Sequence, residues 1–484
     1  MPENALRGFF ILSAGAALAA ASAGLGVMVS TARTTGVALA VVPVVVVVIG
    51  SLIASNRAVL VLAAFALPLL APLPVSDALP LHTGIQLYPS DILVLLAVAS
   101  WVAAWLINPA EARPSLPRTH LLGWPLLLFG AALLAAIIRG HERYGESLFS
   151  LPLRFLLYAG IAFAVSDIKP RDAYKWLVAV FYAGTLWQVG VAIYGYTTGT
   201  SATTQVVLST GGERVLAGST AMFMAAALLL ALLNLETHRA ARAGALHLLM
   251  AGLATFALVS TFQRTTFAVA SILVPVALLV FRRVGLRAAV SVPLLAPFLV
   301  LVALLVPRLD PTLVPTFADR VTASPSTDAS AQWRLKAYAA VWEQVREDPL
   351  RGVGFGRPAI FASNGFRYDV GQDPHNQFLF LWAGGGLLLF GTFVLLLVFY
   401  LLEASSRFRG KPIQERHLVF WAVSVWFVFI VNSLTGITLT RPDLLLVFWV
   451  LMLLPMIVRS QSGDVPGRHD HAERTWLSFP PTRR

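Results

Sequence analysis

Two arginines stand out because each lies in a short gap beside an apolar run. Arg264 lies in Phe262-Gln-Arg-Thr-Thr266, where two apolar runs are joined by almost nothing. A guanidinium near lipid is costly unless it is paired or lines a wet cavity. Arg264 is therefore either a loop arginine that reaches back to water, or an anion-binding group at the mouth of a helix bundle.

Arg214 is the second of these arginines, in Gly211-Gly-Glu-Arg-Val215. Flexible glycines beside an arginine suit phosphate binding, because the guanidinium offers a rigid fork of donors to phosphate oxygens. The alternative is an ordinary loop arginine paired with Glu213. The local sequence leaves both interpretations open.

His375 and Asn376 stand at the start of a later apolar run, in Pro374-His-Asn-Gln377. An imidazole suits general-base work on a hydroxyl, since it changes protonation near neutral pH. The alternative is a histidine at a helix entry that faces water. Asn376 either orients a ligand or caps the helix. Arg154 interrupts another apolar run, and a structural ion pair inside the bundle is the favoured interpretation for it.

Metal chemistry has weak support in this sequence. There is no cysteine, and no pair of histidines shows metal-ligand spacing outside the polar tail. The segment Gly352-Val-Gly-Phe-Gly356 is not a P-loop, because no Gly-Lys-Ser/Thr follows it. We therefore predict no metal and no cofactor. The acidic residues of the loops are scattered: Asp310, Asp319, Asp328, Asp369 and Asp373.

The elements that position these residues belong to a membrane protein. Of 484 residues, 57% are hydrophobic and 12% charged, and the mean hydropathy is +0.75. Soluble proteins have about 25% charged residues, so this composition excludes a soluble, disordered or disulfide-rich chain. Most arginines lie between apolar runs, so the net charge of +12 reflects topology, and we predict no nucleic-acid partner.

The apolar runs have the length needed to cross a bilayer and predict an all-α polytopic fold of about 12 to 14 transmembrane helices. They lie near 8–30, 36–54, 58–73, 91–107, 121–138, 151–166, 174–197, 216–234, 244–262, 266–281, 288–306, 377–402, 417–434 and 442–458.

Lysine and arginine gather in alternate gaps, and by the positive-inside rule those gaps and both termini are cytoplasmic. The opposite gaps then face outward. These outward gaps are 31–35, 74–90, 139–150, 198–215, 263–265, 307–376 and 435–441.

Four regions follow from this plan. They are an N-terminal transmembrane bundle (1–306), a long outward loop (307–376), the last transmembrane helices (377–458) and a polar, disordered cytoplasmic tail (459–484). Within the loop, Trp333, Ala337 and Val341 recur at helical spacing and predict an amphipathic helix from Ala329 to Asp348. It lies on the membrane surface or caps the bundle. A flexible glycine-rich turn follows at 352–356.

This block of residues resembles one superfamily, the O-antigen ligases and O-antigen polymerases of bacterial membranes. The resemblance is carried by Arg334 and its helix to Asp348-Pro349, by Gly352-Val-Gly-Phe-Gly356, by Pro374-His-Asn-Gln377 and by Gly384-Gly-Gly386. It implies a GT-C-like glycosyltransferase of the inner membrane. The implied reaction moves a glycan from undecaprenyl diphosphate to a lipid or glycan acceptor on the periplasmic face, without a metal.

The resemblance also implies roles for individual residues. Arginines at the periplasmic ends of helices hold the diphosphate in this superfamily, and Arg214 and Arg264 match those places best. Arg334 matches a further loop arginine less closely. The loop histidine that activates the acceptor matches His375. From their own positions in the sequence, we predict Asn376 and Arg154 as supporting residues of this site. The chain departs from the superfamily by having about two additional spans.

Several functions compete at this stage. A ligase would move a finished glycan onto lipid A-core or another envelope molecule, whereas a polymerase would join repeat units that remain lipid-linked. A protein O-glycosylating transferase is a third enzyme of the same group. A lipid or polysaccharide transporter would show charged or broken helices near mid-membrane, often in two related halves, and neither is clear here. A non-catalytic scaffold is the last alternative.

Overall fold

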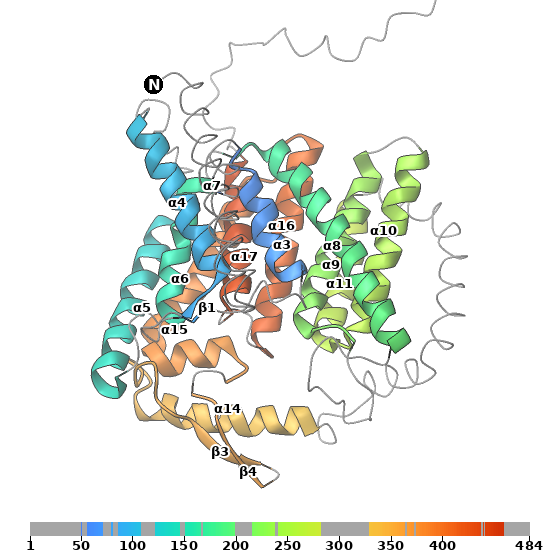
Figure 1. The fold of residues 1–484 in the computed structure, drawn as a ribbon. Helices are drawn as coiled ribbons and strands as arrows, with labels where there is room; N and C mark the ends of the chain where they lie inside the picture. The colour runs from blue at the N-terminus through green and yellow to red at the C-terminus, as the bar shows by residue number, and fades with distance from the viewer. Residues whose placement is uncertain are drawn as a thin grey trace, which may run out of the picture.

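A computed structural model of the chain describes residues 50, 56–70, 79–80, 86–107, 122–145, 151–165, 168–198, 215–237, 241–281, 329–363, 365–371, 374–436, 439 and 441–458. The described part is mostly helical (Figure 1). Arg214 and the predicted tail 459–484 lie outside the described residues.

Every predicted apolar run that falls on described residues forms helix. Among the described residues, six helices are long and apolar enough to cross a membrane, which confirms a polytopic membrane protein. The runs 8–30 and 288–306, and nearly all of 36–54, lie outside the described residues, so the total number of spans stays a prediction. The helices of the bundle are α3 (Val59–Leu69), α4 (Pro89–Ile107), α5 (Gly123–Tyr144), α6 (Leu151–Ala159), α7 (Ile161–Val165), α8 (Pro170–Thr198), α9 (Gly218–Thr237), α10 (Ala241–Ser260), α11 (Arg264–Val280), α15 (Gln377–Ser406), α16 (Ile413–Ser433) and α17 (Pro442–Leu453), with a 3₁₀ turn η2 (Leu454–Ile457).

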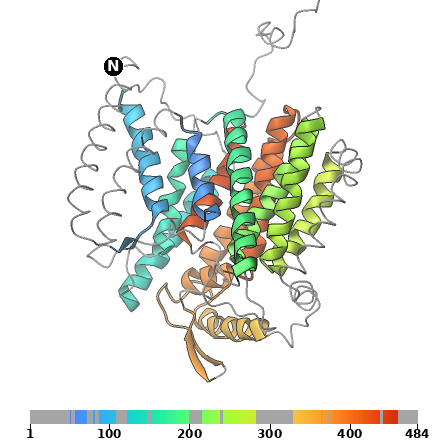
Figure 2. The same cartoon turned by 45° about the vertical axis from the view of Figure 1, so that its right-hand side comes forward.

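The centre of the bundle is formed by α9 and α17, whose residues are almost all buried. Small residues such as Ala225, Ala226 and Ala227 let neighbouring helices approach α9 closely. Helices α8, α10, α11 and α16 pack around it, and Figures 1 and 2 show them side by side. This close packing fixes the positions of the helix ends and of the residues they carry.

Two predicted boundaries were wrong. The run 151–166 divides into α6 and α7 at Gly160, whose amide bonds to the carbonyl of Leu157. Helix α5 continues to Tyr144 and ends at Gly145 in the left-handed conformation, so the predicted gap 139–150 begins later than expected. The extra turn of α5 places Arg139 and Arg143 beside the glycine-rich turn.

Helix α15 is not one continuous span. Gly386 has φ 68° and ψ −167°, which separates Gln377–Gly385 from the rest of the helix. A Cβ at Gly386 would overlap the backbone of Leu350, so glycine is required by both conformation and space. The predicted span 377–402 is therefore a short first segment that enters from the loop, followed by the long segment after Gly386.

The loop region contains α14 (Ala329–Glu347) and a hairpin of β3 (Ile360–Ser363) and β4 (Phe366–Asp369). The helix was predicted; the hairpin was not, although Asn364-Gly365 is a common hairpin signal. Helix α14 packs Ala337, Val341 and Val345 against α15 and the hairpin, so it caps the bundle. Figures 1 and 2 show both elements beyond the lower end of the bundle. A second two-stranded sheet pairs β1 (Leu79–Pro80) with β2 (Gln86–Leu87).

The glycine-rich turn is pinned in place, contrary to the flexible turn expected from its composition. The amides of Val353 and Gly354 bond to the carbonyls of Ala383 and Gly384 at 2.8 and 3.0 Å. A Cβ at Gly352 would overlap the backbone of Gly386. The turn therefore docks the loop region onto α15, and its glycines serve close backbone packing.

Candidate active site

The described parts of the predicted outward gaps meet at one end of the bundle, which we call the loop end because α14 and the hairpin cover it. Thr265 in the first turn of α11 contacts Thr435 after α16, with 3.3 Å between their Oγ1 atoms. The Tyr338 hydroxyl of α14 donates to the carbonyl of Leu434 at 3.1 Å. Ser219 in the first turn of α9 accepts from Arg441 before α17 at 3.4 Å. Residues far apart in the sequence thus share the loop end.

His375 has an unusual backbone. Its φ is 54°, and Phe262 at 53° is the other non-glycine residue among those described with positive φ. Such residues are uncommon outside glycine, and held strain often marks functional sites. The His375 ring is half-buried and lies edge-on to Trp333, with 5.0 Å between ring centroids. Strained backbone therefore occurs at His375 itself and two residues before Arg264.

Asn376 caps α15. Its Oδ1 accepts hydrogen bonds from the amides of Phe378 and Leu379 at 3.0 and 3.1 Å, and its own backbone is extended. Of the two interpretations of Asn376, the structure has the helix cap. The cap also orients His375, because the chain must turn sharply between Pro374 and the first turn of the helix.

Arg264 is the first residue of α11, and its side chain is half-buried. The junction with α10 is as tight as the sequence predicts, since α10 ends at Ser260. The Thr266 hydroxyl donates to Oδ1 of Asn432 at 2.9 Å, which fixes the start of α11 against the end of α16. A helix N-terminus carries partial positive charge, so this position adds to the attraction of Arg264 for an anion.

Tyr338 links the backbone of His375 to the end of α16 near Arg264. Its hydroxyl lies 3.2 Å from the carbonyl oxygen of His375 and 3.1 Å from that of Leu434. Burial raises the pKa of Tyr338, while the charge of Arg334 and a hydrogen bond with Asn376 act in the opposite direction. Arg334, one helical turn earlier in α14, therefore belongs to the same cluster as His375.

Arg154 lies in a buried ion pair. Its Nε is 3.1 Å from Oδ1 of Asp91, and the Tyr158 hydroxyl donates to the same oxygen at 2.6 Å. The guanidinium also lies over the ring of Tyr88, 4.9 Å from its centroid. The structural ion pair favoured from the sequence is thus what the structure has. This pair joins α4 to α6.

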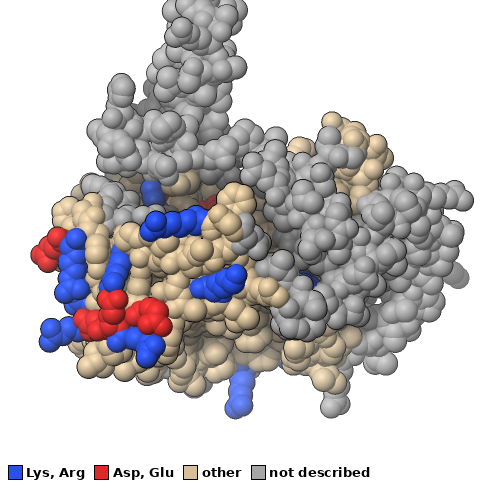
Figure 3. Space-filling model, turned by 90° about the horizontal axis from the view of Figure 1, so that it is seen from below, with Lys and Arg blue, Asp and Glu red and all other residues tan. Residues whose placement is uncertain are grey.

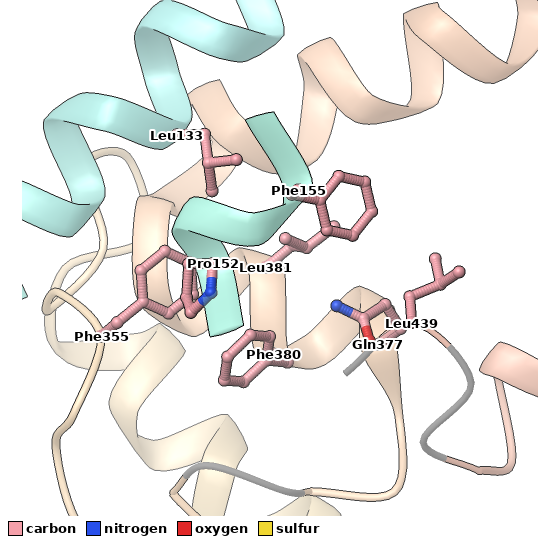
Figure 4. Close-up of a pocket in the computed structure, with 8 residues that line it drawn as sticks. All are labelled: Leu133, Pro152, Phe155, Phe355, Gln377, Phe380, Leu381 and Leu439. Carbon is pink, nitrogen blue, oxygen red and sulfur yellow. The ribbon is translucent and has the colours of Figure 1, made fainter. Parts of the chain in front are cut away.

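An apolar cavity lies beside the first turns of α15, where Gln377, Phe380 and Leu381 line it (Figure 4). Gln377 is its polar side chain, and within the described residues its buried Oε1 has no hydrogen-bond partner. Leu439, from the segment after α16, lines the same cavity as Gln377. The connection between α16 and α17 and the start of α15 therefore line the same cavity. Its lining is Leu133, Pro152, Phe155, Phe355, Gln377, Phe380, Leu381 and Leu439.

Positive charge is spread over the loop end. Figure 3 shows lysine and arginine side chains across this face, whereas most of the acidic side chains in view lie toward one side. Arg357 and Glu347 form an ion pair there, and the Arg357 guanidinium lowers the pKa of Glu347. Within the described residues no group of three or more His, Asp or Glu side chains is placed to hold a metal. The predicted metal independence stays a prediction.

Two features of the loop end were missed in the sequence. Tyr338 is the first, because nothing in the sequence shows that its hydroxyl reaches the backbone of His375. Arg441 and Asp443 were not singled out at all, although Arg441 ends a predicted outward gap. An arginine at the entry of an apolar run was a usable signal. Its partners Asp443 and Ser219 become visible only in the folded chain.

A comparison with known protein families places three of the candidate site residues within one family match. Residues 248–394 match a family model described as O-antigen ligase. A search of curated proteins gave no match. The matched range holds Arg264, Arg334 and His375, together with α14, the hairpin and the break at Gly386. Enzymes of this family carry out membrane glycan transfer of the ligase or polymerase type with lipid-linked donors. The resemblance in the sequence is thereby confirmed for this part of the chain: residues 248–394 of this multi-pass membrane protein are similar to the O-antigen ligase family.

Proposed function

We propose that the protein transfers a glycan from undecaprenyl diphosphate to an acceptor hydroxyl at the outer face of the bacterial inner membrane. The observation that carries this proposal is that Arg264 and His375 are both linked, through neighbouring residues, to the short segment that ends α16. Thr435 contacts Thr265, next to Arg264, and Leu434 shares the Tyr338 hydroxyl with His375. An anion-binding group and a general base thus lie around one short segment of backbone.

The reaction has one bond-forming and one bond-breaking event. His375 accepts the proton of the acceptor hydroxyl as its oxygen bonds to the anomeric carbon of the donor glycan. The bond from that carbon to the diphosphate oxygen breaks, and its electron pair leaves with undecaprenyl diphosphate. Arg264, Arg214 and Arg334 stabilise the negative charge that develops on this leaving group. Fixed guanidinium groups do this without a metal.

The predicted orientation supports the same reaction. Basic residues in the alternate gaps put both termini in the cytoplasm and the loop end in the periplasm. A lipid-linked donor needs a site at the membrane boundary, and the loop end lies where the apolar helices meet α14 and the hairpin. We place the reaction there, with membrane lipids around the bundle.

The acceptor distinguishes the two enzyme classes. We propose a ligase that uses lipid A-core or another envelope molecule, and polymerisation of lipid-linked repeat units is the alternative. The assay uses purified protein in detergent, undecaprenyl-diphosphate glycan from the host, and EDTA. Product that forms only when a second envelope acceptor is added supports the ligase. Longer lipid-linked chains from the donor alone would show a polymerase.

Two substitutions test the residues. His375→Asn keeps a residue that tolerates positive φ but lacks the imidazole, so we expect normal protein levels and at least about a hundredfold loss of transfer. Arg264→Gln removes the charge at the start of α11, and we expect a similar loss. The matched control is Arg346→Gln, because Arg346 on α14 is exposed and pairs only with Glu343 among its recorded contacts.

Three outcomes would contradict the proposal. Full transfer by His375→Asn would show that His375 is not the general base. Full transfer by Arg264→Gln would show that Arg264 does not bind the diphosphate. Activity that returns only with a divalent metal would contradict the arginine mechanism. No turnover by the wild-type protein with any acceptor would favour a transporter.

A further inference from the structure

Arg441 holds a fixed position at the loop end. Its Nε and Nη2 lie 3.2 and 2.7 Å from the two carboxylate oxygens of Asp443, a bidentate pair. The two side chains differ in burial, since 42% of the Arg441 side chain is exposed and 8% of that of Asp443. The carboxylate is thus buried beneath the guanidinium, which faces outward.

The chain geometry accounts for this pair. Pro442 is the first residue of α17, where its fixed φ suits a helix start and its missing N–H costs nothing. Asp443 follows in the first turn, a favourable place for a carboxylate. Arg441, in extended backbone just before the helix, is therefore held by a side chain that the helix itself orients.

The guanidinium keeps donors for a ligand. It has five N–H bonds, and within the described part of the chain the contacts with Asp443 and Ser219 use three of them. A ligand would meet the remaining N–H bonds on Nη1 and Nη2, which point in a fixed direction. Ser219 accepts from Arg441, so its own hydroxyl proton is available to the same ligand. Two N–H groups of the planar guanidinium, together with the Ser219 hydroxyl, form a set of donors that suits phosphate oxygens.

Arg441 lies on the segment that passes the candidate active site. Leu439 lines the same cavity as Gln377, two residues after His375. Thr435, at the other end of this segment, contacts Thr265 beside Arg264. Ser219 lies five residues after Arg214 in the sequence. Short stretches of chain thus connect Arg441 to Arg214, to Arg264 and to His375.

We propose that Arg441 is a further diphosphate-binding residue, with Ser219 as a second donor and Asp443 as the positioning residue that orients the guanidinium. This inference rests on the proposed function, because the anion it binds is the diphosphate of the lipid-linked donor. The competing interpretation is a structural ion pair that joins α17 to α9. That interpretation predicts a change in stability and none in anion binding.

The test measures binding apart from transfer. Full-length protein in detergent is titrated with farnesyl diphosphate and, separately, with farnesyl monophosphate, and melting temperatures are recorded. We expect Arg441→Gln to weaken diphosphate binding about tenfold, a typical effect of losing one charged hydrogen-bonding group, with a melting temperature close to the wild-type value. Arg441→Lys keeps the charge without the fork and should recover part of the loss. Ser219→Ala and Asp443→Asn should each give a smaller loss, and Arg346→Gln none.

The outcomes separate this inference from the proposed function. Unchanged diphosphate affinity in both Arg441→Gln and Ser219→Ala, with normal transfer, would overturn the inference and leave the proposed function intact. Wild-type protein that neither binds the diphosphate nor transfers glycan would overturn the proposed function as well. If Arg441→Gln lowers the melting temperature sharply, Arg441→Lys and Ser219→Ala decide: a selective loss of diphosphate affinity supports the inference, and none overturns it.

Discussion

The hydroxyl of Tyr338 lies 3.2 Å from the carbonyl oxygen of His375, and the same hydroxyl lies 3.1 Å from the carbonyl oxygen of Leu434. One side chain of α14 thus holds the backbone of the strained histidine against the end of α16. Because α14 reaches His375 through this hydroxyl, the loop region contributes to the geometry of the site as well as covering the bundle.

Tyr338→Phe should reduce glycan transfer about tenfold at normal protein level, since a hydrogen bond that orients a catalytic group is worth about 1 kcal/mol or somewhat more. The measurement is the initial rate of transfer by purified protein. Tyr368→Phe is the matched control, because Tyr368 packs its ring near Trp333 and no hydrogen bond of its hydroxyl is recorded among the described residues. Equal rates for Tyr338→Phe and wild type would show that the bridge does not position His375.

Asn376→Ala should destabilise the start of α15 by about 1 kcal/mol, the usual cost of losing a helix cap. Asn376→Asp should keep the stability, because aspartate also caps helices. Thermal unfolding in detergent measures both variants. A loss of transfer in Asn376→Asp without loss of stability would instead assign Asn376 a role in ligand binding.

Gly352→Ala should prevent normal folding, since its Cβ would overlap the backbone of Gly386 and its φ of 73° disfavours any side chain. The expected result is little protein in the membrane fraction, or aggregates on size-exclusion chromatography. Gly391→Ala in α15 is the control, because a Cβ there meets nothing within 4 Å. Normal folding of Gly352→Ala would mean that the turn can shift away from α15.

Asp91→Asn should destabilise the protein by about 3 kcal/mol, because it removes the carboxylate that pairs with the buried guanidinium of Arg154. The exposed pair of Asp172 and Lys175 provides the comparison, and Asp172→Asn should change stability by less than about 0.5 kcal/mol. Thermal unfolding and transfer are measured together. Transfer lost by Asp91→Asn at unchanged stability would place Arg154 in substrate binding.

Which segments form the helices of the bundle could be predicted from the amino-acid sequence. A run of about 20 apolar residues has few stable conformations in a bilayer other than a helix, so length and composition were sufficient. Helix α14 was predicted in a different way, from Ala337 and Val341, which recur at helical spacing. The local motif around His375 was equally visible, because it depends on neighbouring residues.

Which of these residues contact one another depends on the fold of the whole chain. The contacts of Tyr338 with Leu434, of Arg441 with Ser219 and of Gly352 with Gly386 join different elements, and no local pattern encodes them. The structure likewise shows Asn376 as the cap of α15 and Arg154 paired with Asp91, contacts that no local pattern specifies. The physical reason is that hydrogen bonds and close packing depend on distances set by the whole bundle, whereas helix formation depends on composition within one segment.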